Sequence, residues 1–471
     1  MEETVKRGRH HAADGEADIV KSRLGGAIVV LICAITAISI IAYGAVDLWA
    51  LSLLTVLAAV VCCLWAADAW RGRTLSFNFD PLLLPIAALV LLGLVQLLPL
   101  GGPAMPADSI SYPVSRALSL DPYATRIFIV HLIVYGLFFA SALTYINERH
   151  RFRKIVLFII IFVAAMAFFG ILQRLASLES IYGLRQTPQA IPFGSFVNQH
   201  HFAALMEMAS GLTLGLLFGK ATKKTNRPLL IIASVLIGIA IIFTGSRGGL
   251  ISFICVVGFI IAINLFTGKA RQMTPEGEEI TVLSGRPRLM MLAGGGALIA
   301  FIFAMVFLLG GEESALRGVG LQGVSVDFTT GRSHFWAVAI QIFLDHPILG
   351  AGLDAFGNAF TQYDTWNGAL RVQQAHNDYL QILADAGVAG FLCAAGFIFL
   401  LFRKGFRVIR DSEDVFRRNT AIGALAGCFG IFIHSFFDFP LRTPANGFFF
   451  LLLAALATVP IYYPPRHRKV Q

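Results

Sequence analysis

Two arginines stand in glycine-containing turns, each directly before a stretch that should be helical. Arg247 lies in TGSRGG (residues 244–249) and precedes an apolar run, while Gly331-Arg332-Ser333 opens the mostly apolar segment RSHFWAVAIQIFL. The N–H groups at a helix N-terminus lack partners and attract anions, and a guanidinium adds a two-pronged donor. We expect Ser333 to be the N-cap of the second helix. Both arginines are therefore predicted to bind an anion.

His376 is the histidine best placed for catalysis. It stands in QQAHNDYLQ (residues 373–381), just before a predicted helix that runs through Gly387 and Gly390. A helix N-terminus and nearby arginines both disfavour an imidazolium, so the ring should be neutral near pH 7 and able to accept a proton. A general base needs that state. The alternative is a structural histidine that ties a long loop to the rest of the protein.

Further polar residues are weaker candidates for a binding surface. His200 and His201, in Asn198-Gln199-His200-His201, either line an acceptor path or cap a helix. The remaining candidates for binding or support are Arg185, Arg371, Arg442, Asn377 and Tyr379. Interfacial positions explain the other arginines outside the basic segments, namely Arg116, Arg126, Arg174 and Arg317. His131 and His434 should be hydrogen-bonded inside the protein.

No motif in the sequence requires a metal or a nucleotide. The candidate carboxylates Asp327, Asp354, Asp364, Asp378 and Asp438 form no DxD and no close cluster with histidine. No phosphate-binding loop of the Walker or GxGxxG type is present. The six cysteines lie in apolar stretches without a CxxC, so neither a metal site nor a disulfide framework is predicted. We expect no cofactor.

The elements that position these residues are predicted to be transmembrane helices. The chain has 471 residues, of which 56% are hydrophobic and only 14% charged, whereas soluble domains average about 25% charged residues. About 20 apolar residues cross a bilayer as a helix. The apolar runs predict an all-α bundle of twelve spans, at 25–44, 49–67, 81–99, 126–146, 155–175, 200–219, 228–244, 248–267, 289–309, 386–402, 419–438 and 445–463.

The distribution of basic residues predicts the orientation of the bundle. If the N-terminus is cytoplasmic, 28 of the 37 lysines and arginines fall on the cytoplasmic side, and no lysine falls outside. The predicted organisation is a cytoplasmic tail (1–24), nine spans (25–309), a large periplasmic loop with short amphipathic helices (310–385), three spans (386–463) and a cytoplasmic tail (464–471). The net charge of +9 therefore reflects orientation, and no nucleic-acid partner is predicted.

Four motifs together resemble the O-antigen ligase and O-antigen polymerase superfamily of bacterial surface-polysaccharide enzymes. The ligase signature of His, then Asn, Ser or Gln, nine residues, Gly, two residues and a small residue is matched by His376-Asn377, Gly387 and Gly390. The family's two arginine motifs resemble Ser246-Arg247-Gly248 and Gly331-Arg332 followed by Trp336, and its DHPxxGxG stretch resembles residues 345–352. FGSFVNQHHFA (193–203) and HSFFDFP (434–440) look more like members from exopolysaccharide clusters. The resemblance covers at least residues 180–445.

The resemblance implies a membrane glycosyltransferase with a glycan on undecaprenyl diphosphate as donor. Arg247 and Arg332, with Arg185, would hold the diphosphate, and His376 would activate a hydroxyl of the acceptor glycan. Membrane lipids, a chain-length regulator and a flippase are the expected partners, and the cell inner membrane the expected location. A polymerase is preferred over a ligase that transfers to a lipid A core, and a protein O-glycosylating enzyme comes third. The alternative of another class is a transporter or flippase.

Overall fold

The computed structural model describes residues 23–100, 116–176, 180–188, 190–266, 271–273, 279–281, 296, 332–365 and 372–461. Within these ranges the chain is mainly helical, and its only strands form two short antiparallel hairpins. The hairpins pair β1 (Ser180–Ile181) with β2 (Arg185–Gln186), and β3 (Arg271–Met273) with β4 (Glu279–Thr281).

The helices follow one another through short connections. They are α1 (Arg23–Ile41), α2 (Leu48–Gly72), α3 (Leu83–Gln96), α4 (Pro122–Tyr145), α5 (Arg149–Leu175), α6 (Gln199–Phe218), α7 (Arg227–Phe243), α8 (Arg247–Phe266), α10 (Arg332–Asp345), α11 (Phe356–Tyr363), α12 (Asp378–Asp411), α13 (Val415–His434) and α14 (Pro444–Thr458), with 3-10 turns η1 (Tyr43–Ala45), η2 (Lys224–Asn226) and η3 (Pro440–Arg442).

Eleven of the twelve predicted spans coincide with helices, and the span at 289–309 lies outside the described residues. Eight described helices are long and apolar enough to cross a membrane, which makes the chain a multi-pass membrane protein. α3 and α14 are apolar but only 14 and 15 residues long, short of the roughly 20 that a crossing needs. The number of twelve complete crossings therefore stays a prediction.

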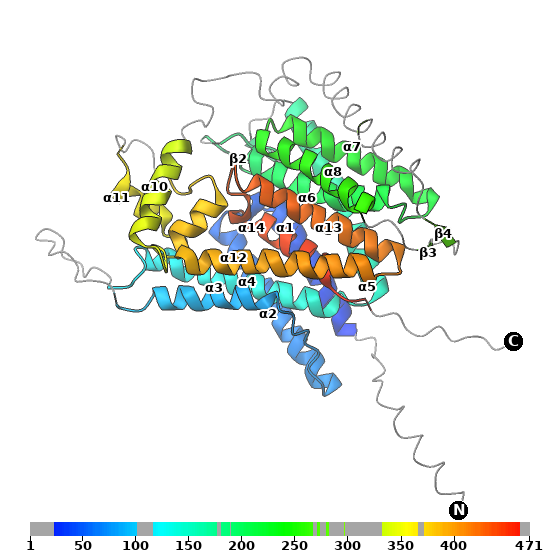
Figure 1. The fold of residues 1–471 in the computed structure, drawn as a ribbon, viewed down its shortest axis with the longest axis horizontal. Helices are drawn as coiled ribbons and strands as arrows, with labels where there is room; N and C mark the ends of the chain where they lie inside the picture. The colour runs from blue at the N-terminus through cyan, green and yellow to red at the C-terminus, as the bar shows by residue number, and fades with distance from the viewer. Residues whose placement is uncertain are drawn as a thin grey trace, which may run out of the picture.

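The central helices α6 and α13 pack with their backbones almost in contact. A methyl group added at Gly211 would lie 2.4 Å from the Gly427 nitrogen, and one at Gly215 would lie 2.5 Å from the Gly423 Cα. Small residues four positions apart let two membrane helices approach this closely. Figure 1 shows α6 and α13 near the middle of the bundle, where they carry residues of the candidate site.

The long helix α12 is interrupted at Gly387, where the chain segment 347–352 inserts. Gly387 has φ +60°, and a Cβ there would lie 2.5 Å from the Ile348 carbonyl carbon, so only glycine fits. Four backbone bonds replace the helical ones: Val388 N to Pro347 O (2.9 Å), Ala389 N to Ile348 O (3.1 Å), Ala351 N to Ala384 O (2.8 Å) and Gly352 N to Asp385 O (3.0 Å). The predicted span at 386–402 is thus part of a longer, interrupted helix.

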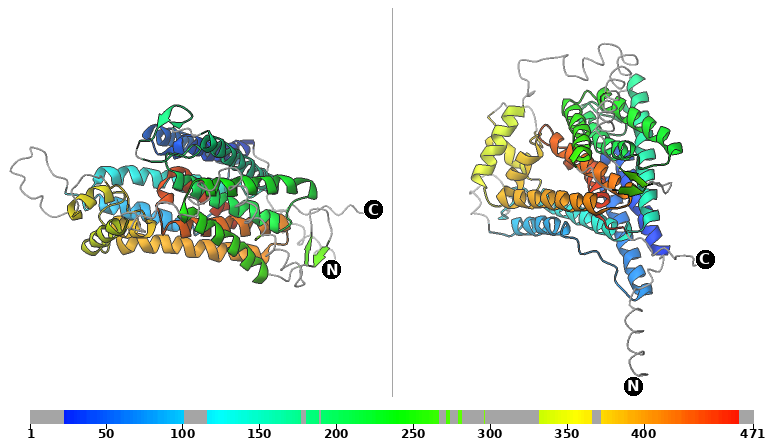
Figure 2. Two further views of the ribbon diagram at one scale, coloured as in Figure 1. Left: turned by 90° about the horizontal axis from the view of Figure 1, so that it is seen from above. Right: turned by 45° about the vertical axis from the view of Figure 1, so that its right-hand side comes forward.

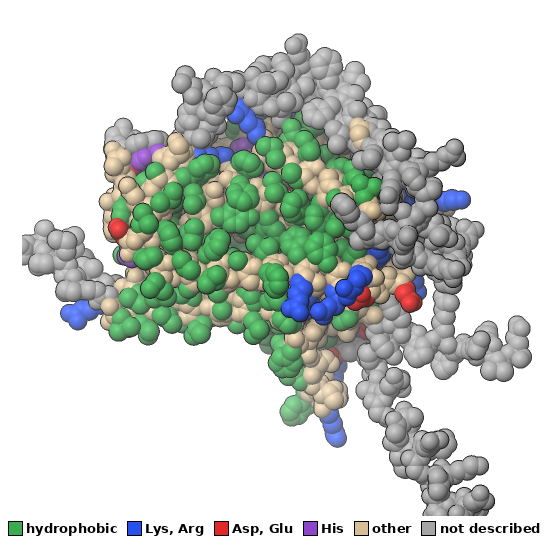
Figure 3. All heavy atoms as spheres, in the orientation of Figure 1, with side chains coloured by type: hydrophobic (Ala, Val, Ile, Leu, Met, Phe, Trp, Pro, Cys, Tyr) green, Lys and Arg blue, Asp and Glu red, His purple; other side chains and the backbone are tan. Residues whose placement is uncertain are grey.

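The two short helices of the predicted periplasmic loop lie together at one end of the bundle (Figure 2). α10 contributes Val338 and Ile342 to a small separate core, and α11 contributes Phe356 and Phe360. α10 ends at Asp345, just before His346-Pro347, as predicted. Hydrophobic side chains cover most of the long face of the bundle, whereas basic and acidic side chains gather at its edges (Figure 3).

Candidate functional site

Residues 435–443, which connect α13 to α14, contact the helices that carry the predicted site residues. We call this segment the 435–443 connection. It receives a hydrogen bond from the α12 backbone, Asp378 N to Ser435 O (3.0 Å), and from α6 through His201, whose Nδ1 lies 2.6 Å from Thr443 Oγ1. It also accepts a hydrogen bond from Arg332 of α10 at Phe437 O. The connection therefore forms the floor on which α6, α10 and α12 meet.

His376 is paired with a buried carboxylate of this connection. Its Nδ1 lies 3.0 Å from Asp438 Oδ1, and the side chain of Asp438 is 2% exposed against 30% for His376. Because a carboxylate accepts, the proton is assigned to Nδ1, which leaves Nε2 as the hydrogen-bond acceptor. Burial alone raises the pKa of the Asp438 carboxyl, but the bond from His376 and the nearby imidazoles outweigh burial and hold that pKa below its usual value. Asp438 is thus the anionic member of the pair.

The backbone and ring of His376 are both held in a defined position. His376 has φ +51°, a left-handed conformation that is unfavourable for a side chain other than glycine and that clusters at functional sites. Its ring stacks on Phe335 (centroids 5.9 Å apart) and meets the edge of Phe439 (4.7 Å). Aromatic walls on two sides limit the directions from which a substrate hydroxyl can reach Nε2.

Arg332 faces the same aspartate from the first turn of α10. Its Nη1 donates to Phe437 O, and its Nη2 lies 3.9 Å from Asp438 Oδ2. That oxygen is buried and has no hydrogen-bond partner within the described part of the chain. The helix begins at Arg332, so Ser333 lies inside its first turn and the prediction of Ser333 as N-cap is wrong. The predicted position of Arg332 at a helix N-terminus is confirmed.

Arg247 opens α8 as predicted, with Ser246 as the N-cap. The Gly249 N–H donates to Ser246 Oγ over 3.1 Å. Arg247 is exposed, and its guanidinium has no hydrogen bond or ion pair with any residue that the structure describes. A Cβ added at Gly248 would lie 3.2 Å from Phe437 Cβ, so the first turn of α8 packs on the 435–443 connection. Arg247 therefore adjoins the same floor as Arg332.

The start of α6 adds two histidines to this end of the bundle. The electrostatic neighbours of His200 include Asp438, His434, Arg332 and His376. Asn198 is the N-cap of α6, since its Oδ1 accepts from His200 N over 2.8 Å. His201 is buried and bonded to the connection, so only the half-buried His200 has a side chain near the site and partly open to a ligand.

Asn377 and Tyr379 hold the segment around His376 in place. Asn377 Oδ1 caps α12 by accepting from Tyr379 N (3.0 Å) and Leu380 N (3.1 Å), while its Nδ2 donates to Phe436 O. The Tyr379 hydroxyl donates to Phe432 O over 2.8 Å. These bonds tie α12 to the end of α13, so we assign a supporting role to both residues.

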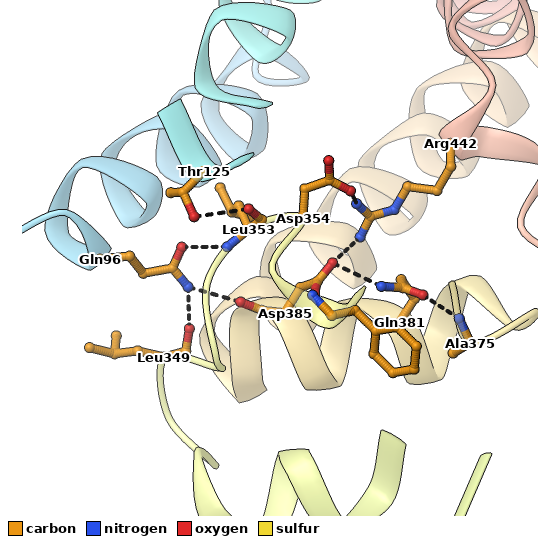
Figure 4. Close-up of polar contacts among 10 residues, drawn as sticks. Gln96, Thr125, Leu349, Leu353, Asp354, Ala375, Gln381, Asp385 and Arg442 are labelled. Carbon is orange, nitrogen blue, oxygen red and sulfur yellow. Dashed lines mark hydrogen bonds and ion pairs between the residues drawn. The ribbon is translucent and has the colours of Figure 1, made fainter. Parts of the chain in front are cut away.

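Arg442 is enclosed in a polar network beside the site (Figure 4). Its Nη1 bonds Asp354 Oδ1 (3.0 Å), and its Nη2 bonds Asp385 Oδ2, which also accepts from Gln381 Nε2 (3.1 Å). Burial alone lowers the pKa of the Arg442 guanidinium, but Asp385, Asp354 and Asp378 outweigh it and raise that pKa. Both prongs of Arg442 are thus committed to protein carboxylates.

Gln96 extends this network to the segment inserted at the break of α12. Its Nε2 donates to Leu349 O (2.5 Å) and Asp385 O (2.9 Å), and its Oε1 accepts from Leu353 N (2.9 Å). The network therefore fastens α3, the inserted segment, α12 and η3 together.

The two remaining arginine candidates are not brought to His376 by the described contacts. Arg185 makes a two-pronged ion pair with Asp47 and lies over the ring of Tyr43, 4.8 Å from its centroid. Arg371 lies outside the described residues.

A second His–carboxylate pair lies in the protein interior below the site. Glu207 Oε2 of α6 is 3.0 Å from His434 Nδ1 of α13, and both side chains are fully buried. This confirms the prediction that His434 is hydrogen-bonded within the bundle. The ring of His434 packs against Gly248, since a Cβ there would lie 3.2 Å from His434 Nε2. Glu207 was not singled out by sequence analysis, although an acidic residue in an apolar span is itself a signal.

Each His–carboxylate pair offers at most two protein ligands to a metal. No group of three or more His, Cys, Asp or Glu side chains suited to a metal occurs among the residues that the structure describes. Metal independence nevertheless stays a prediction.

Fold and site define a multi-pass helical membrane protein with a His–carboxylate pair and two helix-terminal arginines at one end. Residues 232–395 match the family model described as O-antigen ligase, which places the chain in the O-antigen ligase and polymerase superfamily of membrane enzymes. Arg247, Arg332 and His376 lie inside the matched region, whereas Asp438, Glu207 and the 435–443 connection lie outside it. No curated protein matches the chain.

Proposed function

We propose that this protein is a metal-independent glycosyltransferase that polymerises glycan repeat units carried on undecaprenyl diphosphate. The observation that carries the proposal is the pair of His376 and Asp438, with Arg332 facing the same carboxylate. The family implies a lipid-linked glycan donor and an acceptor glycan.

The chemistry follows from the position of each group. Nε2 of His376 accepts the proton of an acceptor hydroxyl while that oxygen attacks the anomeric carbon of the donor. The bond from that carbon to the phosphate oxygen breaks, and its electron pair leaves with undecaprenyl diphosphate. Arg247 and Arg332 bind the diphosphate, whose growing negative charge is stabilised by guanidinium groups and helix N-termini. Asp438 holds the Nδ1–H and stabilises the imidazolium that forms.

The choice of a polymerase over a ligase rests on the acceptor. A polymerase receives the end of another lipid-linked repeat, whereas a ligase receives a sugar of a lipid A core. Of the residues suggested for an acceptor surface, His200 is the one that lies partly open beside His376 and Asp438. The alternative is therefore an O-antigen ligase. A cell lacking the protein should carry single repeat units without long chains, whereas long polymer on undecaprenyl diphosphate above bare cores would establish the ligase.

Replacement of His376 tests the enzyme against a transporter or flippase. His376→Ala should lower glycan transfer by about 10²–10⁴-fold, the usual contribution of a general base. Binding of the lipid-linked donor should persist because Arg247 and Arg332 remain. A transporter would still move its substrate without this base, so turnover above about a third of the wild-type value would reject the catalytic role.

We also propose that the protein lies in the inner membrane with both termini cytoplasmic and the site periplasmic. Single cysteines at positions 185, 332 and 376 should react with an impermeant reagent in intact cells whose outer membrane is open. Labelling only after the inner membrane is permeabilised would reverse the orientation. Activity that EDTA abolishes and added Mg²⁺ or Mn²⁺ restores would reveal a metal site.

A further inference from the structure

An open pocket lies at the opposite end of the bundle from His376. It encloses about 780 Å³ between α5, α7, the end of α6, residues 221–226 and the start of α13. α6 runs from His200 to this pocket, and α7 and α13 run from the pocket to Arg247 and His434. These three helices therefore separate the pocket from the site, and we call it the distal pocket.

The distal pocket has a basic and polar rim and an apolar interior. Arg153 and Lys223 supply positive charge at the rim, and Thr222 adds a hydroxyl oxygen that is buried and has no partner in the described structure. No residue that lines the pocket is acidic. The nearest carboxylate, Asp414, lies 3.2 Å from Arg149 and 3.8 Å from Arg153, so it offsets only part of the rim charge.

The apolar interior continues onto the outer surface of the bundle. Leu157 and Leu229 line the pocket and are 48% and 39% exposed. Ile161 on α5 and Ile232 on α7 follow them about one turn further along and are 49% and 58% exposed. Side chains at this spacing lie on one helix face, so α5 and α7 present an apolar path that starts at the basic rim. A ligand with an anionic head and a long alkyl tail matches this arrangement.

We propose that the distal pocket binds one anionic phospholipid of the surrounding membrane, with its phosphate at Lys223 and Arg153. Its acyl chains would lie along Leu157, Leu229 and the exposed residues beyond them. Basic pockets between membrane helices are the usual sites for anionic headgroups, and a basic residue near an anionic membrane contributes roughly fivefold in affinity. The proposal does not depend on the reaction at His376. The proposed orientation would place the lipid in the cytoplasmic leaflet.

Native mass spectrometry of the purified full-length chain tests the proposal. Phosphatidylglycerol and phosphatidylcholine with matched acyl chains are the probes. We expect one phosphatidylglycerol to be retained in clear preference to phosphatidylcholine. Lys223→Glu should weaken that retention at least fivefold, and Leu229→Trp should weaken it similarly by filling the pocket. The matched controls are Lys224→Glu, an exposed neighbour that does not line the pocket, and Ile232→Trp, which lies about one turn further along α7.

Three outcomes would overturn the proposal. They are equal retention of both lipids, equal losses in the Lys223→Glu and Lys224→Glu variants, and preferential retention of a polyprenyl phosphate, which would assign the pocket to the carrier lipid. Thermal unfolding of each variant separates a lost site from a lost fold. The Leu229→Trp variant keeps the rim charges, so it tests the acyl-chain path even if Lys223→Glu alters the fold.

Discussion

Two buried aspartates near each other in the structure interact with cations in opposite ways. Both oxygens of Asp385 are used: Oδ1 accepts from Phe356 N over 3.1 Å, and Oδ2 accepts from Gln381 and Arg442. In Asp438, Oδ1 accepts from His376 and from Phe439 N, whereas Oδ2 has no hydrogen bond and faces Arg332 at 3.9 Å. The first aspartate is satisfied by the protein, and the second is only half satisfied.

This difference separates a structural ion pair from a candidate catalytic one. Buried polar groups are nearly always hydrogen-bonded, so an unsatisfied buried oxygen needs an explanation. Next to Asp438 lie a partly exposed imidazole in a left-handed conformation and a guanidinium that is 24% exposed. Next to Asp385 lies Arg442, which is 14% exposed and fully bonded. Function is therefore expected at Asp438 and architecture at Asp385, and the following experiments test that division.

The largest expected effect is on turnover in the Asp438→Asn variant. The substitution keeps the size of the side chain but removes the charge that fixes the Nδ1–H tautomer of His376. We expect transfer to fall by roughly 10²-fold or more, within the range for general acid–base catalysis, with Tm nearly unchanged. Asp385→Asn is the control, because it should lower Tm more than turnover. If Asp438→Asn kept more than a third of wild-type turnover, the comparison would fail.

The next effect is on stability in the Arg442→Met variant. Removing Arg442 leaves Asp385 buried without its counter-ion, which costs about 3–5 kcal/mol of unfolding free energy. The double variant Arg442→Met/Asp385→Asn should recover part of that loss, as measured by thermal unfolding in detergent. Turnover per folded molecule should stay within about threefold of wild type. A large loss of turnover in fully folded Arg442→Met would instead give Arg442 a role in binding substrate.

A smaller effect is expected when Arg332 or Arg247 is replaced by lysine. Lysine keeps the charge but loses the two-pronged geometry, and a hydrogen bond to a charged group contributes about 1.5–3 kcal/mol. Transfer should therefore fall by roughly 10- to 150-fold at normal membrane levels. Arg126→Lys, on the exposed face of α4, is the control and should retain full activity. Full activity of both test variants would mean that positive charge alone suffices.

The smallest effect concerns the pH dependence of stability. The pKa of Asp438 is lowered in the folded protein, so its charge stabilises the fold above the unfolded pKa of about 3.9. That contribution is lost only as pH falls below this value. The difference in Tm between wild type and Asp438→Asn should thus be constant from pH 5 to 9 and shrink below about pH 4. A difference that changes near pH 6.5 would point to His376 as the group whose titration controls stability.

Much of the fold could be predicted because membrane helices leave a local signal. The apolar runs predicted eleven described helices, and the glycine turn before Arg247 and the proline after His346 predicted where α8 begins and where α10 ends. The lengths of α3 and α14 were overestimated, since apolar residues next to a helix look the same in sequence as those inside it. Span 289–309 lies outside the described residues.

The candidate site was predicted only in part. Arg247, Arg332 and His376 could be named because each stands at a predicted helix start. Asp438, the partner of His376, was considered only as an isolated carboxylate, because it lies 62 residues away and nothing local connects the two. The acidic residue in the apolar run FFDFP was the available signal. Arg442 was suggested as an acceptor-binding residue because its partners Asp354 and Asp385 could not be identified from the sequence.

The sequence by itself determined that this protein is a helical membrane protein with arginines at helix starts and a histidine at a third. Those properties depend on hydropathy over about 20 residues and on capping within one turn. Only the tertiary structure decided which carboxylate holds His376, how segment 347–352 enters the break at Gly387, and that the 435–443 connection lies beneath the site. These arrangements join residues from distant parts of the chain, because close glycine packing and insertion at a helix break act between helices and not along them.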